Sequence, residues 1–298
     1  MQTQTTTLQR ENLDFYMRPA GLTSAGRHAK LFSELPREIP ALVRIVQGLA
    51  LHRYMAPAYG VTIPEERGEE DHIRPVEQML DCLLSINAAP LSETRPPESR
   101  LVGVCRHFAI LLVAMLRAKG IAARARCGVG SYFNPGRFDD HWVCEYWNAQ
   151  EGRWALADPQ FDELWRSNLK IDHNILDVPR DRFLVAGEAW ARCRAGKADP
   201  SKFGIFDLQG LWFIAGELVR DVAALNNMEM LAWDVWGAMP RPDQKLQEEQ
   251  LAFFDRLAEL TRAPDTSFEE LRKLYESDRR VHVPATVFNS LRNRQEAI

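Results

Sequence analysis

The sequence predicts an α+β fold in which one helix packs on an antiparallel sheet, with further helices before and after this core. Residues 105–158 carry a helical pattern and then three strand-like runs, in the order helix, strand, loop, strand, turn, strand. On both sides of this stretch, apolar residues recur at helical spacing. Strands gathered in one segment and helices gathered around it are typical of the α+β class.

The composition is that of an ordinary globular protein and excludes several classes. The chain has 298 residues, of which 46% are hydrophobic and 26% charged, so it is not disordered or fibrous. Its net charge of −4 disfavours a nucleic-acid partner, because nucleic-acid-binding domains are usually basic. The longest apolar run, residues 108–116, is shorter than the roughly 20 residues of a membrane-spanning helix. We therefore expect no membrane partner.

The cysteines and the N-terminus indicate a cytoplasmic protein with free thiols. The five cysteines are odd in number and form no CxxC pair, and the first residues lack the basic and apolar regions of a secretion signal. A zinc site would combine Cys127 and Cys144 with His141 or Cys105, but closely spaced ligand pairs are missing. We expect no metal and no cofactor.

The N-terminal part is predicted to be mostly helical. Residues 1–12 are polar, and we expect them to be loose. Residues 27–55 repeat apolar side chains at helical spacing, with Pro36 and Pro40 marking starts or breaks. A second helix is predicted over residues 76–86, before a proline-rich connection.

The predicted core begins with a helix over residues 105–118 that is apolar almost all round, which predicts burial. Gly120 suits the left-handed position that ends such a helix. Three runs rich in apolar and aromatic residues then predict strands, over residues 121–130, 141–147 and 154–158.

Helical periodicity returns after residue 159, over residues 182–194, 208–226, 245–262 and 268–279. We therefore divide the chain into an N-terminal helical region (1–69), an α+β core (70–175) and a C-terminal helical subdomain or cap (176–298). Trp233 and Trp236 would share one face of a helix. They either pack in the core, which we favour, or line an apolar pocket.

Cys105, His141 and Asp158 are the candidate catalytic residues. Cys105 opens the predicted buried helix, where the helix dipole and unpaired backbone N–H groups favour a thiolate. His141 begins one strand and Asp158 ends the next. If the turn centres between residues 149 and 150, His141 and Asp158 lie directly opposite each other. The same register pairs Val143 with Leu156 and Glu145 with Trp154.

This arrangement suits nucleophilic catalysis, because a carboxylate can orient an imidazole that acts as the base for a thiol. Each residue alone has a more ordinary interpretation: an inert core cysteine, a structural histidine and a turn aspartate. The three together, in this order and at these positions, favour a catalytic triad.

The stretch GVCRHFAILLVAMLRAKGIAARARCGVG, followed by DDHWVCEYW and WALADPQ, resembles the transglutaminase-like cysteine enzymes. The resemblance covers residues 103–160 and implies a papain-like fold, with Cys105 as nucleophile, His141 as general base and Asp158 as orienting acid. The chain departs from the animal transglutaminases, because no tryptophan precedes Cys105 and no acidic loop resembles a calcium site. It is similar to a compact bacterial-type branch that contains both hydrolases and acyltransferases.

Residues next to the candidate triad are candidate substrate contacts. Two follow the cysteine on its helix, three lie in the loop before His141, and one follows His141. For each of them a structural role is the alternative. These residues are Arg106, His107, Tyr132, Phe133, Phe138 and Trp142.

The resemblance implies acyl transfer through an acyl-enzyme on the cysteine. The acyl donor would be a peptide, an amide or a carrier-protein thioester, and the acceptor an amine or water. Cover from the aromatic loop 132–138 and the tryptophan-rich helices after residue 180 would exclude water, which favours an amine acceptor. The alternatives are a cysteine peptidase or amidase and a non-catalytic transglutaminase-like binding module, against which the intact triad argues.

Overall fold

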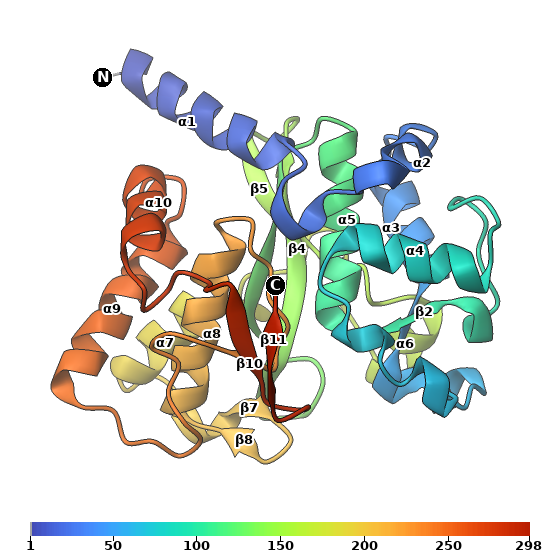
Figure 1. Cartoon of the computed structure of the whole chain (residues 1–298). Coiled ribbons are helices and arrows are strands. Elements are labelled where there is room, and N and C mark those ends of the chain that lie inside the picture. Colours follow the sequence, from blue (N-terminus) through green and yellow to red (C-terminus); the bar gives the residue numbers. More distant parts are fainter. Residues whose placement is uncertain (1) are drawn as a thin grey trace. The chain divides into compact units, whose positions relative to one another are not determined.

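The computed structural model describes the backbone from Gln2 to Ile298 and the side chains from Arg10 onward. The chain forms two compact units, whose elements are labelled in Figure 1. Unit 1 contains residues 1–125 and 143–178, and unit 2 contains residues 126–142 and 179–298. Two strands, β3 (Ala123–Gly130) and β4 (Phe138–Asn148), each run from one unit into the other.

Unit 1 is built around α5 (Cys105–Ala118), which is buried along almost its whole length, as its apolar sequence predicts. Four helices and a parallel pair of short strands pack against it. These are α1 (Gln2–Met17), α2 (Ala29–Ser33), α3 (Ile39–Leu49), α4 (Val76–Ile86), β1 (Ala50–His52) and β2 (Leu101–Gly103). Unit 1 also contains α6 (Glu163–Leu169).

Two expectations for the N-terminal region are wrong. Residues 2–12 belong to α1 rather than to a loose segment, and Met1 lies outside the described residues. The fully buried ring of Tyr16 packs against Trp154, with ring centroids 5.8 Å apart, and this long-range contact stabilises the end of α1. The helical pattern of residues 27–55 also breaks early, because residues 50–52 leave α3 to pair with β2.

The main sheet confirms the α+β class. Its strand order is β6-β3-β4-β7-β8, and β5 pairs with β4. The pairs β3–β6, β4–β5 and β7–β8 are antiparallel, whereas β4–β7 is parallel, so the sheet is mixed rather than purely antiparallel. The added strands are β5 (Arg153–Ala157), β6 (Phe183–Val185), β7 (Phe203–Ile205) and β8 (Leu208–Gln209).

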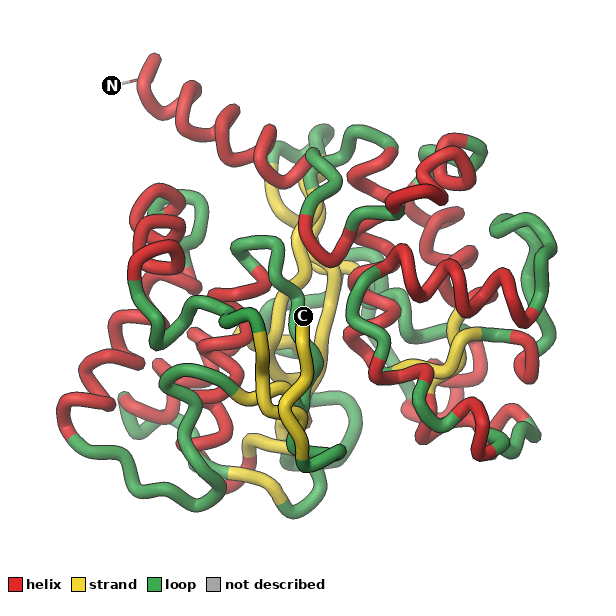
Figure 2. The backbone as a smooth tube through the Cα atoms, viewed as in Figure 1, coloured by secondary structure: helices red, strands yellow, loops and turns green. Residues whose placement is uncertain are grey.

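Unit 2 combines helices with a second sheet. The first three helices pack on one another, and the fourth contacts the second and third. They are α7 (Ala186–Arg194), α8 (Leu211–Ala224), α9 (Glu248–Arg262) and α10 (Phe268–Ser277). The small sheet, drawn in yellow near the C-terminus in Figure 2, was not predicted. It contains β9 (Asp234–Val235), β10 (Thr286–Asn289) and β11 (Arg294–Ala297).

Trp190 and Trp236 of unit 2 are core residues. Trp236 is 5% exposed and donates its indole N–H to the carbonyl oxygen of Val281 at 3.1 Å, and Trp233 lies in a turn rather than on a helix. Trp190 of α7 packs against Phe254 of α9. The predicted shared helix face of Trp233 and Trp236 is therefore wrong, and Trp190 fills the packing between helices.

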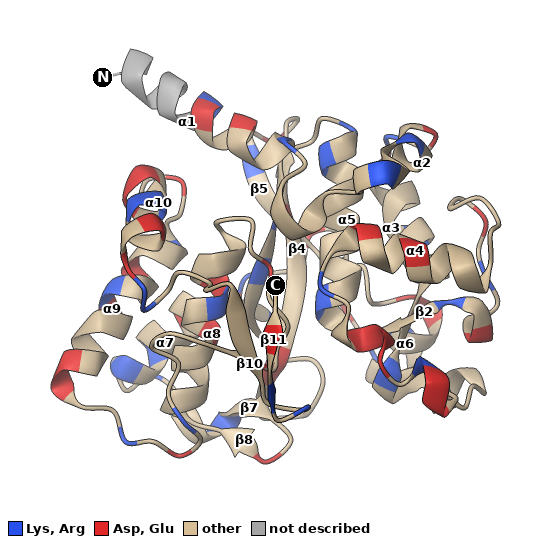
Figure 3. Ribbon diagram, in the orientation of Figure 1, with Lys and Arg blue, Asp and Glu red and all other residues tan. Residues whose placement is uncertain are grey.

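The surface carries both signs of charge. In the ribbon of Figure 3, the positions of acidic and basic residues are interspersed along each unit rather than gathered in one region of a single sign. Among the described residues, no helix has both the length and the apolar composition that crossing a bilayer requires.

Candidate active site

Cys105 is the first residue of α5 and is 8% exposed. The residue before it, Val104, has extended backbone and donates its N–H to Nδ1 of His107 at 3.2 Å. His107, the third residue of α5, thus closes the helix end on which Cys105 stands. Its Nδ1 acts as an acceptor in a neutral ring, and burial lowers the pKa of His107 well below its usual value.

Arg106 links the same end of α5 to the backbone of residues 73 and 74. Its guanidinium is fully buried and donates to the carbonyl oxygens of Ile73, at 3.3 Å, and Arg74, at 2.8 Å. Arg106 and His107 therefore hold the backbone around Cys105. A direct contact of either side chain with substrate stays a prediction.

Tyr54 is a neighbour of Cys105 that the sequence did not reveal. It is 54% exposed, and its pKa is raised by burial first, then by the carboxylate of Asp71, with a further contribution from the charge of Cys105. The parallel β1–β2 pairing places His52 opposite Gly103 and so carries Tyr54 towards the cysteine. No local pattern links residues fifty positions apart, and only this pairing could have indicated the neighbourhood.

Asp158 follows β5 and is fully buried. Its backbone N–H donates to the carbonyl oxygen of Ile175 at 2.8 Å, and its Oδ1 accepts the N–H of Gln160 at 3.1 Å. This second bond is an Asx turn, which fixes the orientation of the carboxylate. The turn role and an orienting role in catalysis are compatible in this residue.

The predicted register of the β4–β5 hairpin is wrong. Glu145 lies opposite Leu156, and the last strand pair joins Cys144 and Ala157, so Asp158 lies beyond the ladder and does not face His141 across it. The shift is two residues, which leaves every side chain on its expected face of the sheet.

The cause of the shift is a longer loop. Residues 149–152 separate the strands, where a turn centred between residues 149 and 150 was predicted. Asn148 accepts the N–H groups of Gln150 and Glu151 with its side-chain oxygen, at 3.1 and 3.3 Å. Gly152 closes the loop with φ of +64°, a left-handed conformation that glycine adopts without steric cost.

His141 belongs to unit 2, lies in β4 and is 1% exposed. Three aromatic rings surround its imidazole, with centroid distances of 4.9 Å to Phe133, 5.8 Å to Tyr132 and 6.1 Å to Phe183. The loop that was predicted to rim the site thus contacts the candidate base. All three contacts are edge-on, with interplanar angles of 67° to 89°.

The other two predicted contacts of this region have packing roles. Phe138 stacks on Phe203 with centroids 4.7 Å apart and an interplanar angle of 5°, and Trp142 is fully buried. Cys105 and Asp158 belong to unit 1, and His141 belongs to unit 2. Their joint catalytic role, and any substrate contact of these aromatic residues, remain predictions.

Comparison with known proteins gives the family. Residues 70–159 match the model of the transglutaminase-like superfamily. This protein contains a transglutaminase-like domain. A protein-glutamine gamma-glutamyltransferase of Pseudomonas aeruginosa is 30% identical over 110 residues, which cover 30% of this chain and 16% of that relative. The chain thus corresponds to a small part of the relative's length.

One solved structure is also similar. It is a candidate cysteine protease from Cytophaga hutchinsonii, with 20% sequence identity and a TM-score of 0.32, covering 51% of this chain and 43% of that protein. A TM-score of this size does not establish a shared fold. The assignment to the transglutaminase-like superfamily depends on the matched segment, which contains Cys105, His141 and Asp158.

The other four cysteines of this transglutaminase-like protein are in environments that disfavour a thiolate. Burial raises the pKa of Cys82 and of Cys193 to about 11. Burial also raises the pKa of Cys144 and, further, that of Cys127, where the Glu217 carboxylate adds to the effect. Cys105 is the one cysteine that begins a helix of the transglutaminase-like domain.

One buried group has donor atoms close enough to hold a metal. Single donor atoms of Cys127, Asp140 and Glu217 lie within 4.8 Å of one another. The Cys127 thiol donates to Oε2 of Glu217 at 2.5 Å, and Arg220 donates to Oε1 of Glu217 at 2.9 Å. A divalent cation here would have to displace the thiol proton and lie beside a guanidinium, so the group fits a hydrogen-bonded network better than a metal site.

Proposed function

We propose that this protein is a cysteine-dependent acyltransferase that moves an acyl group to an amine, with Cys105 as nucleophile, His141 as general base and Asp158 as orienting acid. The observation that carries the proposal is the position of Cys105 at the N-terminus of the buried helix α5, inside the transglutaminase-like domain. The name of the Pseudomonas relative, a glutamyltransferase, supports transfer as the reaction type.

In the proposed first step, the Cys105 thiolate attacks the carbonyl carbon of an amide or thioester. The C–S bond forms, and the electron pair of the carbonyl moves to oxygen. When the carbonyl double bond re-forms, the bond to the leaving group breaks. The protonated His141 gives its proton to the departing amine or thiol, which leaves an acyl-enzyme and a neutral imidazole.

In the second step, an amine attacks the acyl-enzyme carbonyl and gives a proton to His141, and the thiolate leaves. The product is a new amide, and the enzyme returns to its starting state. Asp158 would keep the imidazole in one tautomer and stabilise its charged form. The Asx turn that fixes the Asp158 carboxylate supports this orienting role.

Two groups beside Cys105 are suited to stabilise the oxyanion. Cys105 begins the first turn of α5, where the backbone N–H groups and the positive end of the helix dipole are located. The Tyr54 hydroxyl lies within electrostatic reach of Cys105 and is partly exposed. It would replace the tryptophan donor that this chain lacks before the cysteine.

The surroundings of His141 favour an amine over water as the acceptor. An imidazole that is 1% exposed and enclosed by three aromatic rings is shielded from bulk water. A transferase needs such shielding, because water competes for the acyl-enzyme at roughly 55 M, the concentration of the bulk solvent, against a dilute amine.

The test is to form the acyl-enzyme and offer it amines. A small activated thioester should add one acyl group to the protein, located on Cys105 by peptide mass mapping. Graded concentrations of amines should then give saturable amide formation for one class of amine. Cys105→Ala should abolish acylation and His141→Ala should reduce it at least about 100-fold, the usual contribution of a general base.

Cys193→Ala is the matched control, because it removes a half-buried thiol on α7 that has no proposed role. It should keep the wild-type rate. Acylation of another cysteine would contradict the nucleophile assignment. Partitioning that stays with water at every amine concentration would make the protein a hydrolase, and a protein that accepts no acyl group would be a binding module.

A further inference from the structure

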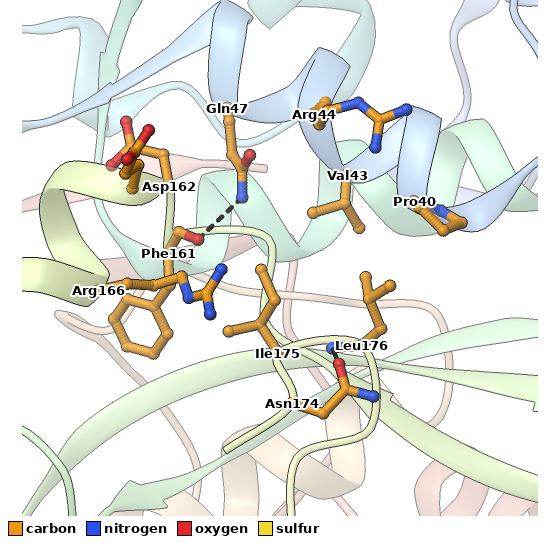
Figure 4. Close-up of a pocket in the computed structure, with 11 residues that line it drawn as sticks. Pro40, Val43, Arg44, Gln47, Phe161, Asp162, Arg166, Asn174, Ile175 and Leu176 are labelled. Carbon is orange, nitrogen blue, oxygen red and sulfur yellow. Dashed lines mark hydrogen bonds between the residues drawn. The ribbon is translucent and has the colours of Figure 1, made fainter. Parts of the chain in front are cut away.

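A cavity of about 350 Å³ lies in unit 1 between α3 and α6. We call it the two-arginine pocket, after Arg44 of α3 and Arg166 of α6. Both side chains are exposed and line the cavity. Figure 4 shows them extending from the two helices, with Val43, Ile175 and Leu176 between them as an apolar wall. Neither guanidinium has an ion-pair partner among the described residues, although both line the cavity.

Three acceptor groups of the pocket are already in use. The carbonyl oxygen of Phe161 accepts from Gln47 at 3.0 Å, and the side-chain oxygen of Asn174 accepts from the N–H of Leu176 at 3.0 Å. The Asp162 carboxylate accepts from the N–H of Trp165 at 3.1 Å and from the Tyr59 hydroxyl at 2.6 Å. With these three acceptors in use, the pocket favours a ligand that accepts hydrogen bonds from Arg44 and Arg166.

The charge of the lining points the same way. Asp162 is committed to its two donors, and Glu163, at the start of α6, is exposed like Arg44 and Arg166. The lining therefore holds two cations against one uncommitted carboxylate. The two arginines remain as the uncommitted cations of the cavity. A guanidinium binds a carboxylate or a phosphate through two parallel hydrogen bonds, so the two arginines of the lining suit an oxyanion.

The size and the apolar wall limit the rest of the ligand. Ligand pockets span about 300–1,000 Å³, so this cavity, at about 350 Å³, takes only a small molecule. Val43, Ile175 and Leu176 offer surface for a short hydrocarbon group. We propose that the two-arginine pocket binds a small organic oxyanion, a carboxylate or a phosphate monoester, through Arg44 and Arg166, with its hydrocarbon part against this wall.

This binding does not depend on the acyl-transfer proposal. The pocket lies beside the candidate site, since Ile175 of its wall accepts the backbone N–H of Asp158, but no residue of the triad lines it. Binding is therefore measured by titration calorimetry on the wild-type chain and on Cys105→Ala. The two proteins should bind equally well even if the proposed chemistry fails.

The probes are hexanoate and hexyl phosphate, with hexanol as the uncharged control. At least one anion should bind with one-to-one stoichiometry, more weakly at high salt, and hexanol should not bind. The anion that binds more tightly identifies the headgroup. Along the series acetate, butyrate and hexanoate, affinity should rise about fourfold per CH₂ group while the chain fits the wall.

Arg44→Gln and Arg166→Gln should each weaken binding by about 10- to 100-fold, the effect of losing one charge-assisted interaction. Arg18→Gln is the matched control, because Arg18 is an exposed arginine of unit 1 away from the pocket. It should leave affinity unchanged. Three results would overturn the proposal: no saturable binding of either anion, equal binding of hexanol, or unchanged affinity in the Arg44→Gln/Arg166→Gln double variant.

Discussion

The buried ion pair between Arg124 of β3 and Glu145 of β4 allows a quantitative test of how unit 1 is stabilised. Both side chains are 2% exposed, and Arg124 Nε donates to Glu145 Oε2 at 2.7 Å. The guanidinium also lies 4.0 Å from the ring centroid of Trp154 and 5.1 Å from that of Tyr16. Glu145→Leu would leave this cation buried without its carboxylate.

Such a change should lower the free energy of unfolding by about 3–5 kcal/mol, the usual cost of an unpaired buried charge. The double variant Arg124→Met/Glu145→Leu removes both charges, and the contacts of the guanidinium with the rings that it loses contribute about 2 kcal/mol or less. The double variant should therefore be more stable than the single one. Domains have about 5–15 kcal/mol in total, so the single change is large.

Urea unfolding followed by circular dichroism and by tryptophan fluorescence measures both values. The two probes should give one midpoint, and unchanged m-values would assign the shifts to stability. Asp177→Leu is the control, because it breaks the exposed pair with Arg153, which solvent screens, and should have a much smaller effect. The reasoning fails if Glu145→Leu costs no more than this control, or if the double variant is as unstable as the single one.

Three further predictions concern thiols and carboxylates. Limiting iodoacetamide at pH 7 should label Cys105 first, because burial raises the pKa of Cys82 and of Cys193 to about 11 and so leaves little reactive thiolate on them. Mass mapping that finds another cysteine labelled first would contradict this. Asp158→Asn should keep about 10- to 100-fold more turnover than Cys105→Ala with the fold intact, and equal loss would require another role for the aspartate. Burial, and then the charge of Glu217, raise the pKa of Asp140. The folded protein therefore binds this proton more tightly than the unfolded chain does. The stability that this contributes is lost as pH rises from about 4, the usual pKa of an aspartate, through the raised pKa. Asp140→Asn should thus gain stability relative to wild type between pH 5 and pH 8 in urea titrations, and a constant difference would refute this.

Local patterns in the sequence were sufficient for the central helices. Both α4 and α5 have the predicted bounds, because their apolar residues recur at helical spacing and clear signals end them. The position of Cys105 at a helix start follows directly. The resemblance to transglutaminase-like enzymes, read from the same segment, is confirmed by the family match over residues 70–159. The joint role of the three candidate catalytic residues stays a prediction.

The errors concern contacts between distant residues. The hairpin register depends on where the loop between the two strands is centred. Hydrogen bonds made by Asn148 and Gly152 stabilise a four-residue loop over residues 149–152, whose centre differs from the predicted one between residues 149 and 150. The helix α1 depends on packing of Tyr16 against a residue more than a hundred positions away. Tyr54 lies near Cys105 because β1 and β2, with three residues each, pair in parallel just before these two residues. None of these signals is present in local periodicity.

The way the chain passes between the two units limits how the protein can be divided or inherited. Residues 126–142 leave unit 1 for unit 2 and return, so the matched segment 70–159 holds pieces of both units and all of neither. A gene fragment that encodes this segment alone would lack α1, α3, and most of unit 2. Recombination at a single point would likewise separate strands that pair with each other. This transglutaminase-like domain is therefore exchangeable only together with the sequences on both sides of it, and its folding must join residues far apart in the chain, which makes it slow.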